Sequence, residues 1–192
     1  MVKLLLSYYD QDNKFALKSL QQAFILAARW QKLEYMKLIL GVSGPDFIHS
    51  RDSNGRTVIY EAIARGDKTE VFEFLLASGA DVNAVDNACP LGASPLMFAV
   101  NYGRPECAKG LLVAGAAVNY LVNACTPLDI VHLSDLGGYK ESDKRDECRA
   151  KMVEVLKAAG GLTAAEIELD MDTGLGLGGS DDSEVGGDDV IG

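Results

Sequence analysis

Apolar residues recur along the middle of the chain in pairs of short amphipathic segments. In one such pair the first segment covers residues 94–102 and the second covers residues 105–114, with a glycine between them. Pro105 suits the first position of a helix, because the N–H that proline lacks has no helical partner there. Gly115 follows the second segment and can take the left-handed conformation that often ends a helix. The pattern therefore predicts two short helices joined by a turn.

This helix pair repeats along the chain. When the segment that begins at Asp52 is aligned with the one that begins at Asp86, glycine, leucine and asparagine positions fall into register. The matched positions include Gly66 with Gly103, Gly79 with Gly115, and Asn83 with Asn119. Neither helix of a pair can bury its apolar face alone, so neighbouring pairs must stack. We predict an all-α solenoid of stacked helix-turn-helix units with hairpin-like turns, in four units: 20–51, 52–85, 86–119 and 120–165, the outer two degenerate.

The recurring residues resemble the ankyrin repeat, whose motif combines T-P-L-H-x-A, a glycine, a leucine pair and G-A-D-V-N at a period of about 33 residues. "GADVN" at 79–83 and "TPL" at 126–128 match outright, and "SPLMFA" and "TVIYEA" match with changes. The histidine position of the motif holds Tyr60, Met97 and Asp129. The resemblance implies that the family's threonine-to-histidine hydrogen bonds are mostly absent here, so that stability rests on helix packing instead.

Two stretches depart from the repeat. Residues 134–148 form a charged, glycine-containing insertion in the last unit, and the sequence leaves open whether it is a loop or a short added helix. Residues 170–192 hold seven acids and no base, whereas residues 1–169 hold 21 acids and 18 bases. The last segment is also rich in glycine and has no helical or strand period, which predicts a disordered acidic tail. Alternatively, the tail docks on basic partners or on the concave face of the array.

Composition argues against several other roles. The chain has no basic stripe that would suit nucleic acid, and no apolar run reaches the length needed to cross a bilayer. Its first residues lack the apolar region of a secretory signal. We therefore expect a cytoplasmic monomer, with no nucleic acid and no membrane among its partners.

Candidate catalytic and metal-binding groups are few. Asp81 and Asp86 could serve as an acid/base pair, but Asp81 belongs to the "GADVN" motif and Asp86 matches the turn residue Asp52. The four cysteines include no C-x-x-C pair, and there are only two histidines. Cys89 and Cys125 lie in successive turns, where a spacing of about 10 Å exceeds disulfide reach without rearrangement. We expect no enzyme activity, no cofactor and no metal.

The resemblance also points to binding residues, because partners of the family are usually held by turn tips and by the exposed end of each first helix. The helix-end candidates are Arg29, Trp30, Arg65, Asn101 and Tyr102, and the turn-tip candidates are Asn54, Arg56, Asn87, Leu91 and Asn123. Trp30, Arg65 and Tyr102 share one repeat position, and these residue types are enriched in binding hot spots. Alternatively, Trp30 and Tyr102 only cover the apolar sides of the terminal units.

The expected function is that of a protein–protein interaction module, which binds an unknown partner protein through its concave face and turn tips. A regulatory or redox-responsive module, acting through its cysteines or its acidic tail, is the alternative.

Overall fold

The computed structural model describes residues 14–53, 55–67, 69–86, 93–133 and 142–173. Four helix pairs follow one another: α2 (Lys14–Arg29) with α3 (Leu33–Ser43), α4 (Val58–Arg65) with α5 (Glu70–Ala77), α6 (Pro95–Asn101) with α7 (Pro105–Val113), and α8 (Pro127–Leu133) with α9 (Ser142–Ala158). A 3-10 helix, η1 (Pro45–His49), follows α3, and α10 (Ala164–Thr173) follows α9. The predicted all-α repeat fold is confirmed.

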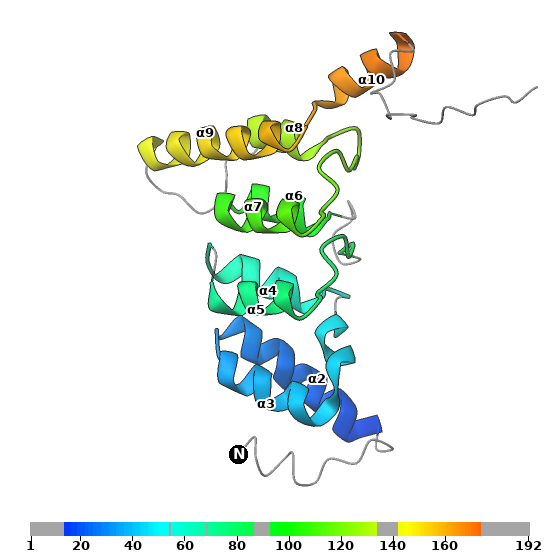
Figure 1. Ribbon diagram of the computed structural model, residues 1–192, viewed down its shortest axis with the longest axis vertical. Coiled ribbons are helices and arrows are strands. Elements are labelled where there is room, and N and C mark those ends of the chain that lie inside the picture. The colour runs from blue at the N-terminus through cyan, green and yellow to red at the C-terminus, as the bar shows by residue number, and fades with distance from the viewer. Residues whose placement is uncertain (1–13, 54, 68, 87–92, 134–141, 174–192) are drawn as a thin grey trace, which may run out of the picture.

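The helix pairs stack in chain order along the long axis of the molecule (Figure 1). The first helices α2, α4, α6 and α8 pack on one another in series, and so do the second helices α3, α5, α7 and α9. Each first helix also packs against the second helix of its own pair. Helix α10 projects from the far end of the stack (Figure 1). Contacts are thus made between neighbouring units, as stacking of units that cannot bury their own apolar faces requires.

One hydrophobic core runs through all four pairs. The largest fully buried side chains come from successive layers and include Phe24, Tyr60, Phe72, Leu96, Leu111 and Leu128. The first leucine of each aligned pair, Leu75 or Leu111, is fully buried, whereas the second is only partly buried. The leucine pair of the motif therefore gives each second helix its inward-facing side.

Local signals set the ends of the helices. The side chains of Thr69 and Ser94 cap α5 and α6 by accepting hydrogen bonds from backbone N–H groups in the first turn. Pro105 is the first residue of α7, as predicted. Gly79 and Gly115, which follow α5 and α7, have φ angles of 83° and 90°. These angles confirm the predicted left-handed conformation at both positions.

Equivalent asparagines tie each unit to the next. The Asn83 side chain donates to the carbonyl oxygen of Gly115 at 3.2 Å and accepts from the N–H of Ala117 at 2.9 Å. Asn119, one unit later, makes the same two bonds to the turn after α9, at 3.1 and 2.8 Å. The two asparagines that the sequence alignment pairs are therefore structurally equivalent.

Two buried cysteines also occupy equivalent positions. The Cys107 thiol donates to the carbonyl oxygen of Gly66 at 3.6 Å, and the Cys148 thiol donates to that of Gly103 at 3.3 Å. Both carbonyls belong to the glycine between the two helices of the preceding unit. Asp67, next to Gly66, accepts backbone N–H bonds from the first turn of α7. The junction between the helices of one unit thus anchors the second helix of the next.

The Thr57 hydroxyl has no hydrogen-bond partner among the described residues, as the expected loss of the threonine-to-histidine bonds implies, but two of the three residues at the histidine position make hydrogen bonds of their own. The Tyr60 hydroxyl donates to the carbonyl oxygen of Ala93, at 2.7 Å, in the turn that leads to α6. Asp129 Oδ2 accepts from the N–H and the hydroxyl of Thr126, both at 2.9 Å, and from the N–H of Ala164 at 2.8 Å. Burial raises the pKa of Asp129, but these bonds outweigh burial, and the net pKa is lowered. Both substitutes therefore connect their helix to the following part of the chain.

The insertion in the last unit is partly helical. Helix α9 begins at Ser142, inside the stretch 134–148, so the second half of the insertion lengthens this helix. Residues 134–141 lie outside the described residues. At the other end of the array, α2 begins at Lys14, before the predicted start of the first unit at residue 20.

The boundary predicted at residue 170 falls inside a helix. Helix α10 includes Asp170 and extends to Thr173. Thr163 and Glu166 explain where this helix begins, because Glu166 Oε2 accepts from the Thr163 N–H at 2.7 Å while the Thr163 hydroxyl oxygen accepts from the Glu166 N–H at 3.2 Å. This reciprocal pair is a capping box. Residues 174–192, the remainder of the predicted tail, lie outside the described residues.

Candidate functional site

The residues that end the first helices form a row on one face of the stack. Trp30 follows α2, Arg65 ends α4, and Tyr102 follows α6. The Arg65 guanidinium carbon lies 5.7 Å from the centroid of the Trp30 ring, a cation–π distance. Trp30 is 64% exposed. The structure thus places the three candidates at the same position of successive units and brings two of them into contact.

A groove of about 320 Å³ lies along this row. Its walls come from α2, α4, α6 and the turn before α4. Arg29, Arg56, Arg65 and Tyr102, all predicted as binding residues, line it, and so does Ala64, which shares the helix end with Arg65. Three further lining residues, Tyr60, Glu61 and Phe98, were not predicted as binding residues. We call this surface the arginine groove.

Arg29 and Glu61 form a two-bond ion pair at one end of the arginine groove. Arg29 Nε lies 2.9 Å from Glu61 Oε2, and Arg29 Nη2 lies 2.8 Å from Glu61 Oε1. The hydrogen bonds from Arg29 are the main reason that the pKa of Glu61 is lowered, although burial opposes them. Glu61 is only 9% exposed, whereas the Arg29 side chain is 36% exposed, so the pair connects α2 to α4 at a partly buried place.

Sequence reasoning missed Glu61, although a signal was present. Glu61 lies four residues before Arg65, so both side chains lie on the same face of α4, one helical turn apart. The same spacing relates Phe98 to Tyr102 on α6. Extending the helix-end rule back by one turn would have found both residues.

Arg56 connects two units at the other end of the arginine groove. Its Nε donates to Asp86 Oδ2 at 2.7 Å, and Asp86 is fully buried. This hydrogen bond is the main reason that the pKa of Arg56 is raised. The guanidinium carbon also lies 5.7 Å from the centroid of the Phe98 ring. Arg56, predicted only as a turn-tip binding residue, is therefore also part of the framework.

Aromatic rings form one wall of the arginine groove. The centroids of Phe98 and Tyr102 are 4.4 Å apart with the rings tilted by 31°, and the Tyr60 ring meets Phe98 edge-on at 5.2 Å. Tyr102 thus covers an apolar side chain, as the alternative interpretation of this residue expects. It also lines the groove, so the two roles coexist in one side chain.

The other predicted residues lie apart from the arginine groove or outside the described residues. Asn101 is exposed at the end of α6. Asn123 and Ala124 have φ angles of 49° and 59° and form a tight turn between Val122 and Cys125, which pair as an isolated antiparallel bridge. The remaining candidates, Asn54, Asn87 and Leu91, are outside the described residues.

Comparison with known proteins agrees with this geometry. A family model described as ankyrin repeats (3 copies) matches residues 1–86 and 24–122. The chain belongs to the ankyrin repeat family. Ankyrin repeat and SOCS box protein 11 from Homo sapiens and from Pongo abelii are each 33% identical to this ankyrin chain over 102 residues. The match covers 48% of this chain and 30% of each relative, so it spans less than a third of their length.

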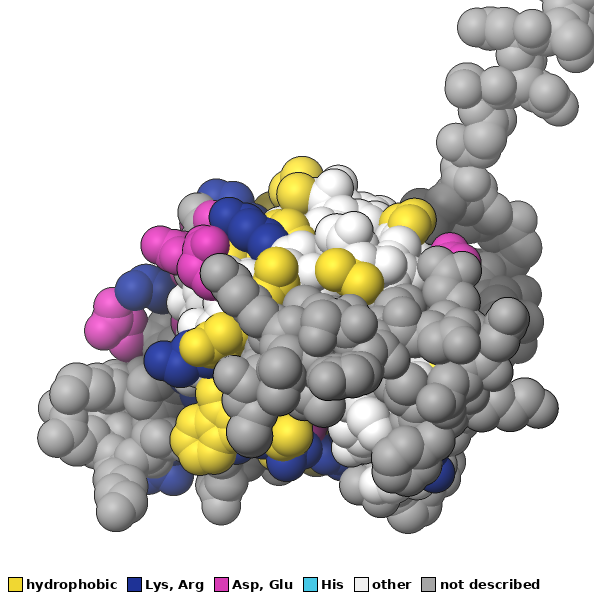
Figure 2. Space-filling model, turned by 90° about the horizontal axis from the view of Figure 1, so that it is seen from below, with side chains coloured by type: hydrophobic (Ala, Val, Ile, Leu, Met, Phe, Trp, Pro, Cys, Tyr) yellow, Lys and Arg dark blue, Asp and Glu magenta, His cyan; other side chains and the backbone are white. Residues whose placement is uncertain are grey.

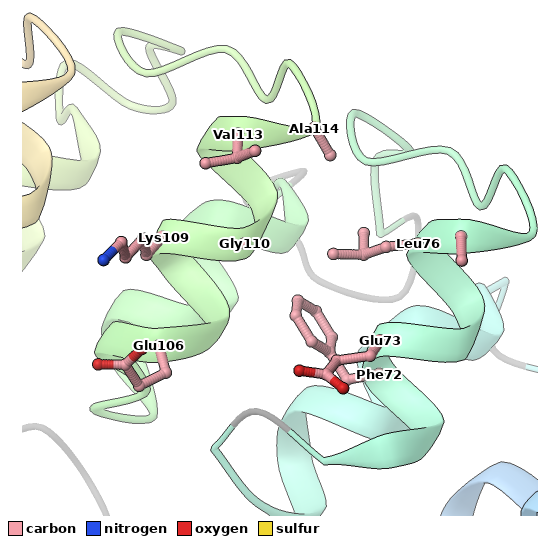
Figure 3. A pocket seen from close by; sticks show the side chains of 9 residues that line it. Phe72, Glu73, Leu76, Glu106, Lys109, Gly110, Val113 and Ala114 are labelled. Atoms are coloured by element: carbon pink, nitrogen blue, oxygen red, sulfur yellow. The ribbon is translucent and has the colours of Figure 1, made fainter.

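The second helices of two neighbouring pairs in the ankyrin array, α5 and α7, form a different kind of groove, of about 460 Å³ (Figure 3). The Phe72 ring points toward Gly110, where an added Cβ would lie 3.0 Å from the ring edge. The glycine therefore allows the ring to pack against α7. Leu76 and Val113 extend the apolar lining, and the charged residues are Glu73, Glu106 and Lys109. This outer groove is apolar, in contrast to the arginine groove.

The first two helices of the ankyrin array carry several exposed hydrophobic residues. On α2 and directly after it, Leu26 is 44% and Trp30 is 64% exposed, and on α3 Tyr35 is 48% exposed. Figure 2, which views this end of the array, shows hydrophobic side chains beside Lys, Arg, Asp and Glu side chains. Terminal units of a solenoid usually present a polar outer face.

The acidic residues first considered as an acid/base pair act in the framework. Asp81 accepts from the N–H of Asn83 at 2.9 Å, and Asp86 pairs with Arg56. Within the described ranges, no group of three or more His, Cys, Asp and Glu side chains is arranged to hold a metal ion. No helix in that part of the chain has the length and apolar character needed to cross a membrane.

Proposed function

We propose that this chain is a protein-interaction module that holds a partner protein against the arginine groove and the adjacent Trp30. The chain consists of ankyrin repeats, and ankyrin repeats in general are protein-interaction modules. The observation that carries the proposal is the row of Trp30, Arg65 and Tyr102, in which three residue types common in hot spots occupy one repeat position. Trp30 is 64% exposed, an unusual exposure for a tryptophan that has no binding role.

The mechanism is recognition by a preformed surface. The ion pairs of Arg29 and Arg56 and the ring contacts of Tyr102 hold the walls of the groove before a partner arrives. Little side-chain freedom is then lost on binding, so more of the contact energy contributes to affinity. We propose no catalytic role for the chain, and we propose that it acts as a cytoplasmic monomer.

The proposal is tested by replacing Trp30, Arg65 and Tyr102 together with alanine. Partners captured from a lysate of the native organism by the unmodified chain are identified, and their affinity for the variant is measured. Loss of a single hot spot costs about 2 kcal/mol or more, so we expect affinity to fall by at least about 30-fold. The melting temperature should change little.

A matched control replaces exposed residues on the second helices instead. Tyr35, Lys37 and Val113 are exposed and lie on α3 or α7, away from the first helices. Their triple alanine variant should bind as the unmodified chain does. If the groove variant keeps its affinity, the proposed surface is wrong. If the alanine variant of Trp30, Arg65 and Tyr102 unfolds, Arg65→Ala alone is used to test the surface, because the Arg65 side chain is exposed at a helix end and its loss should not unfold the array.

The redox-responsive alternative stays a prediction. Cys89 lies outside the described residues, and Cys107 and Cys148 are buried with their thiols donating to backbone carbonyls. Alkylation of thiols followed by mass spectrometry, under oxidising and reducing conditions, would detect a link between Cys89 and Cys125.

A further inference from the structure

We infer that the partner segment bound in the arginine groove presents a carboxylate to Arg65, with an apolar side chain next to it that packs against Trp30. This inference rests on the proposed function, because it names the chemistry of the partner at the same surface. It follows from an imbalance between hydrogen-bond donors and acceptors in the groove, from the charge of its lining, and from the exposed ring beside Arg65.

The arginines of the groove have more donors than the described residues use. A guanidinium group carries five N–H donors and no acceptor. Arg29 spends two of them on Glu61, and Arg56 spends one on Asp86. Arg65 makes no hydrogen bond or ion pair to any other described residue; its charge acts on Glu61, and its guanidinium carbon lies 5.7 Å from the centroid of the Trp30 ring. Most of the guanidinium donors of this surface are therefore not used by the described residues.

The carboxylate acceptors of the groove are already engaged. Both oxygens of Glu61 accept from Arg29, and the Tyr60 hydroxyl is directed at the backbone carbonyl of Ala93. Asp86 is fully buried and cannot reach a ligand. A bound segment must therefore bring its own acceptors, or leave guanidinium donors without partners at a buried interface, which is costly.

Charge favours a carboxylate over a larger anion. Three arginines line the groove; Glu61 and Asp86 are hydrogen-bonded to two of them, and the charge of Asp52 acts on the same two, whereas Arg65 has no carboxylate hydrogen-bonded to it in the described part of the chain. A single carboxylate matches the single charge and the planar fork of the Arg65 guanidinium group. A phosphate carries nearly two charges at neutral pH, and its second charge would face Glu61.

The apolar part of the ligand follows from the ring beside Arg65. Trp30 is 64% exposed and lies in contact with the guanidinium group, so a side chain that covers it also shields the new ion pair from water. Shielding strengthens an ion pair, because it lowers the local dielectric constant. A volume of about 320 Å³ accommodates a few side chains rather than a whole helix. The geometry therefore fits a short acidic and apolar segment.

Trp30 provides the assay, because it is the only tryptophan of the chain. Its fluorescence in the full chain is recorded while acetyl-Glu-Leu-amide is added at low ionic strength, and acetyl-Gln-Leu-amide and inorganic phosphate are tested in parallel. We expect a saturable change with the acidic peptide only. Added salt should weaken this binding, since an accessible ion pair is screened.

Variants test the role of Arg65. Arg65→Gln should weaken binding of the acidic peptide by about 10-fold or more, the equivalent of one charge-assisted hydrogen bond, and Arg65→Lys should weaken it less. Lys37→Gln removes the same charge from an exposed position on α3 and should leave binding unchanged. Circular dichroism of each variant checks that the helices remain folded.

Several results would overturn the inference: no saturable binding of the acidic peptide, equal binding of the neutral peptide, tighter binding of phosphate, or an affinity that Arg65→Gln does not change. Failure of the proposed function looks different. If the alanine variant of Trp30, Arg65 and Tyr102 loses its natural partner but the acidic peptide does not bind, only the inference is wrong. If the peptide binds but the natural partner does not need these residues, the proposed function is wrong.

Discussion

Replacing Arg29 with methionine should destabilise the array and make its stability depend more strongly on pH. The substitution keeps most of the apolar stem of the side chain and removes the guanidinium group, so the loss concerns the ion pair. Glu61 then lies at 9% exposure between α2 and α4 without its partner. An unpaired carboxylate in such a place loses its hydration and gains nothing in return.

The magnitude follows from the two bonds that disappear. A hydrogen bond to a charged group contributes about 1.5 to 3 kcal/mol, and breaking a fully buried pair costs about 3 to 5 kcal/mol. The Arg29 side chain is 36% exposed, so water already competes for it and the upper range does not apply. We expect Arg29→Met to lower the free energy of unfolding by about 2 to 3 kcal/mol at neutral pH.

The pH dependence has a definite sign. Arg29 holds the pKa of Glu61 below its ordinary value of 4.5, so the pair stabilises the fold above that pH, and its contribution is lost as pH falls through the lowered pKa. In the variant the opposing effect of Arg29 is gone, so burial, which the more distant charges of Arg65 and Arg56 oppose only weakly, should raise the pKa of Glu61 above its value in the unmodified chain. As pH falls, Glu61 is then protonated in the variant before it is protonated in the unmodified chain, and protonation removes the cost of the unpaired charge. The loss of unfolding free energy caused by Arg29→Met should therefore be smaller near pH 5 than near pH 7.

Urea unfolding at the two pH values measures both effects. A double variant, Arg29→Met with Glu61→Leu, removes both charges and should recover most of the loss, because replacing a buried ion pair with apolar residues is often nearly neutral. A loss below about 0.5 kcal/mol in the single variant at neutral pH would refute the reasoning, since that is the range of an exposed pair. A penalty that grows toward pH 5 would refute it as well.

Two further predictions concern the repeat itself. Asn83→Ala and Asn119→Ala should each lower the free energy of unfolding by about 1 kcal/mol, since each removes two partly solvated hydrogen bonds between units. The two losses should add in the double variant, because the two sites lie in different interfaces. Urea unfolding that shows no loss in the single variants, or strong coupling in the double variant, would contradict this. Gly115→Ala and Gly41→Ala should act in opposite directions, although neither added Cβ would have a neighbour within 4 Å. Gly115 has a φ angle of 90°, so alanine should cost about 1 kcal/mol there, whereas Gly41 lies inside α3 and alanine should gain up to about 1 kcal/mol. Melting temperatures that move in the same direction for both variants would show that backbone conformation is not the deciding factor.

Much of the fold was predictable because each unit repeats the same local solution. A glycine after a second helix and an asparagine in the next turn each carry out one backbone task, and both recur at equivalent places in the next unit, as Gly79 with Gly115 and Asn83 with Asn119. The structure shows the same two bonds at Asn83 and Asn119, which is why aligning the sequence with itself paired them correctly. Local rules of this kind are visible in a single sequence.

Interactions between units were harder to predict, because they depend on how the helices face each other. The Arg29–Glu61 and Arg56–Asp86 pairs join residues about one repeat apart, 32 and 30 positions along the chain. Motif positions say which residues end a helix, but not which side chains meet across the stack. The extension of α9 into residues 142–148 was left open for a similar reason, since charge and glycine content favour a loop and a helix almost equally.

The structure also separates residues that build the arginine groove from residues available to a partner. Arg29 and Arg56 each close an ion pair between units, so replacing either one disturbs the framework and the binding surface together. Arg65 and Trp30 contact each other but form no described hydrogen bond or ion pair with another unit. A loss of binding in an Arg29 or Arg56 variant therefore does not distinguish recognition from folding, whereas a loss in an Arg65 or Trp30 variant of unchanged stability does. The groove combines both kinds of residue because, in a stack of small units, a surface that crosses three units must be held by the same contacts that hold the units together.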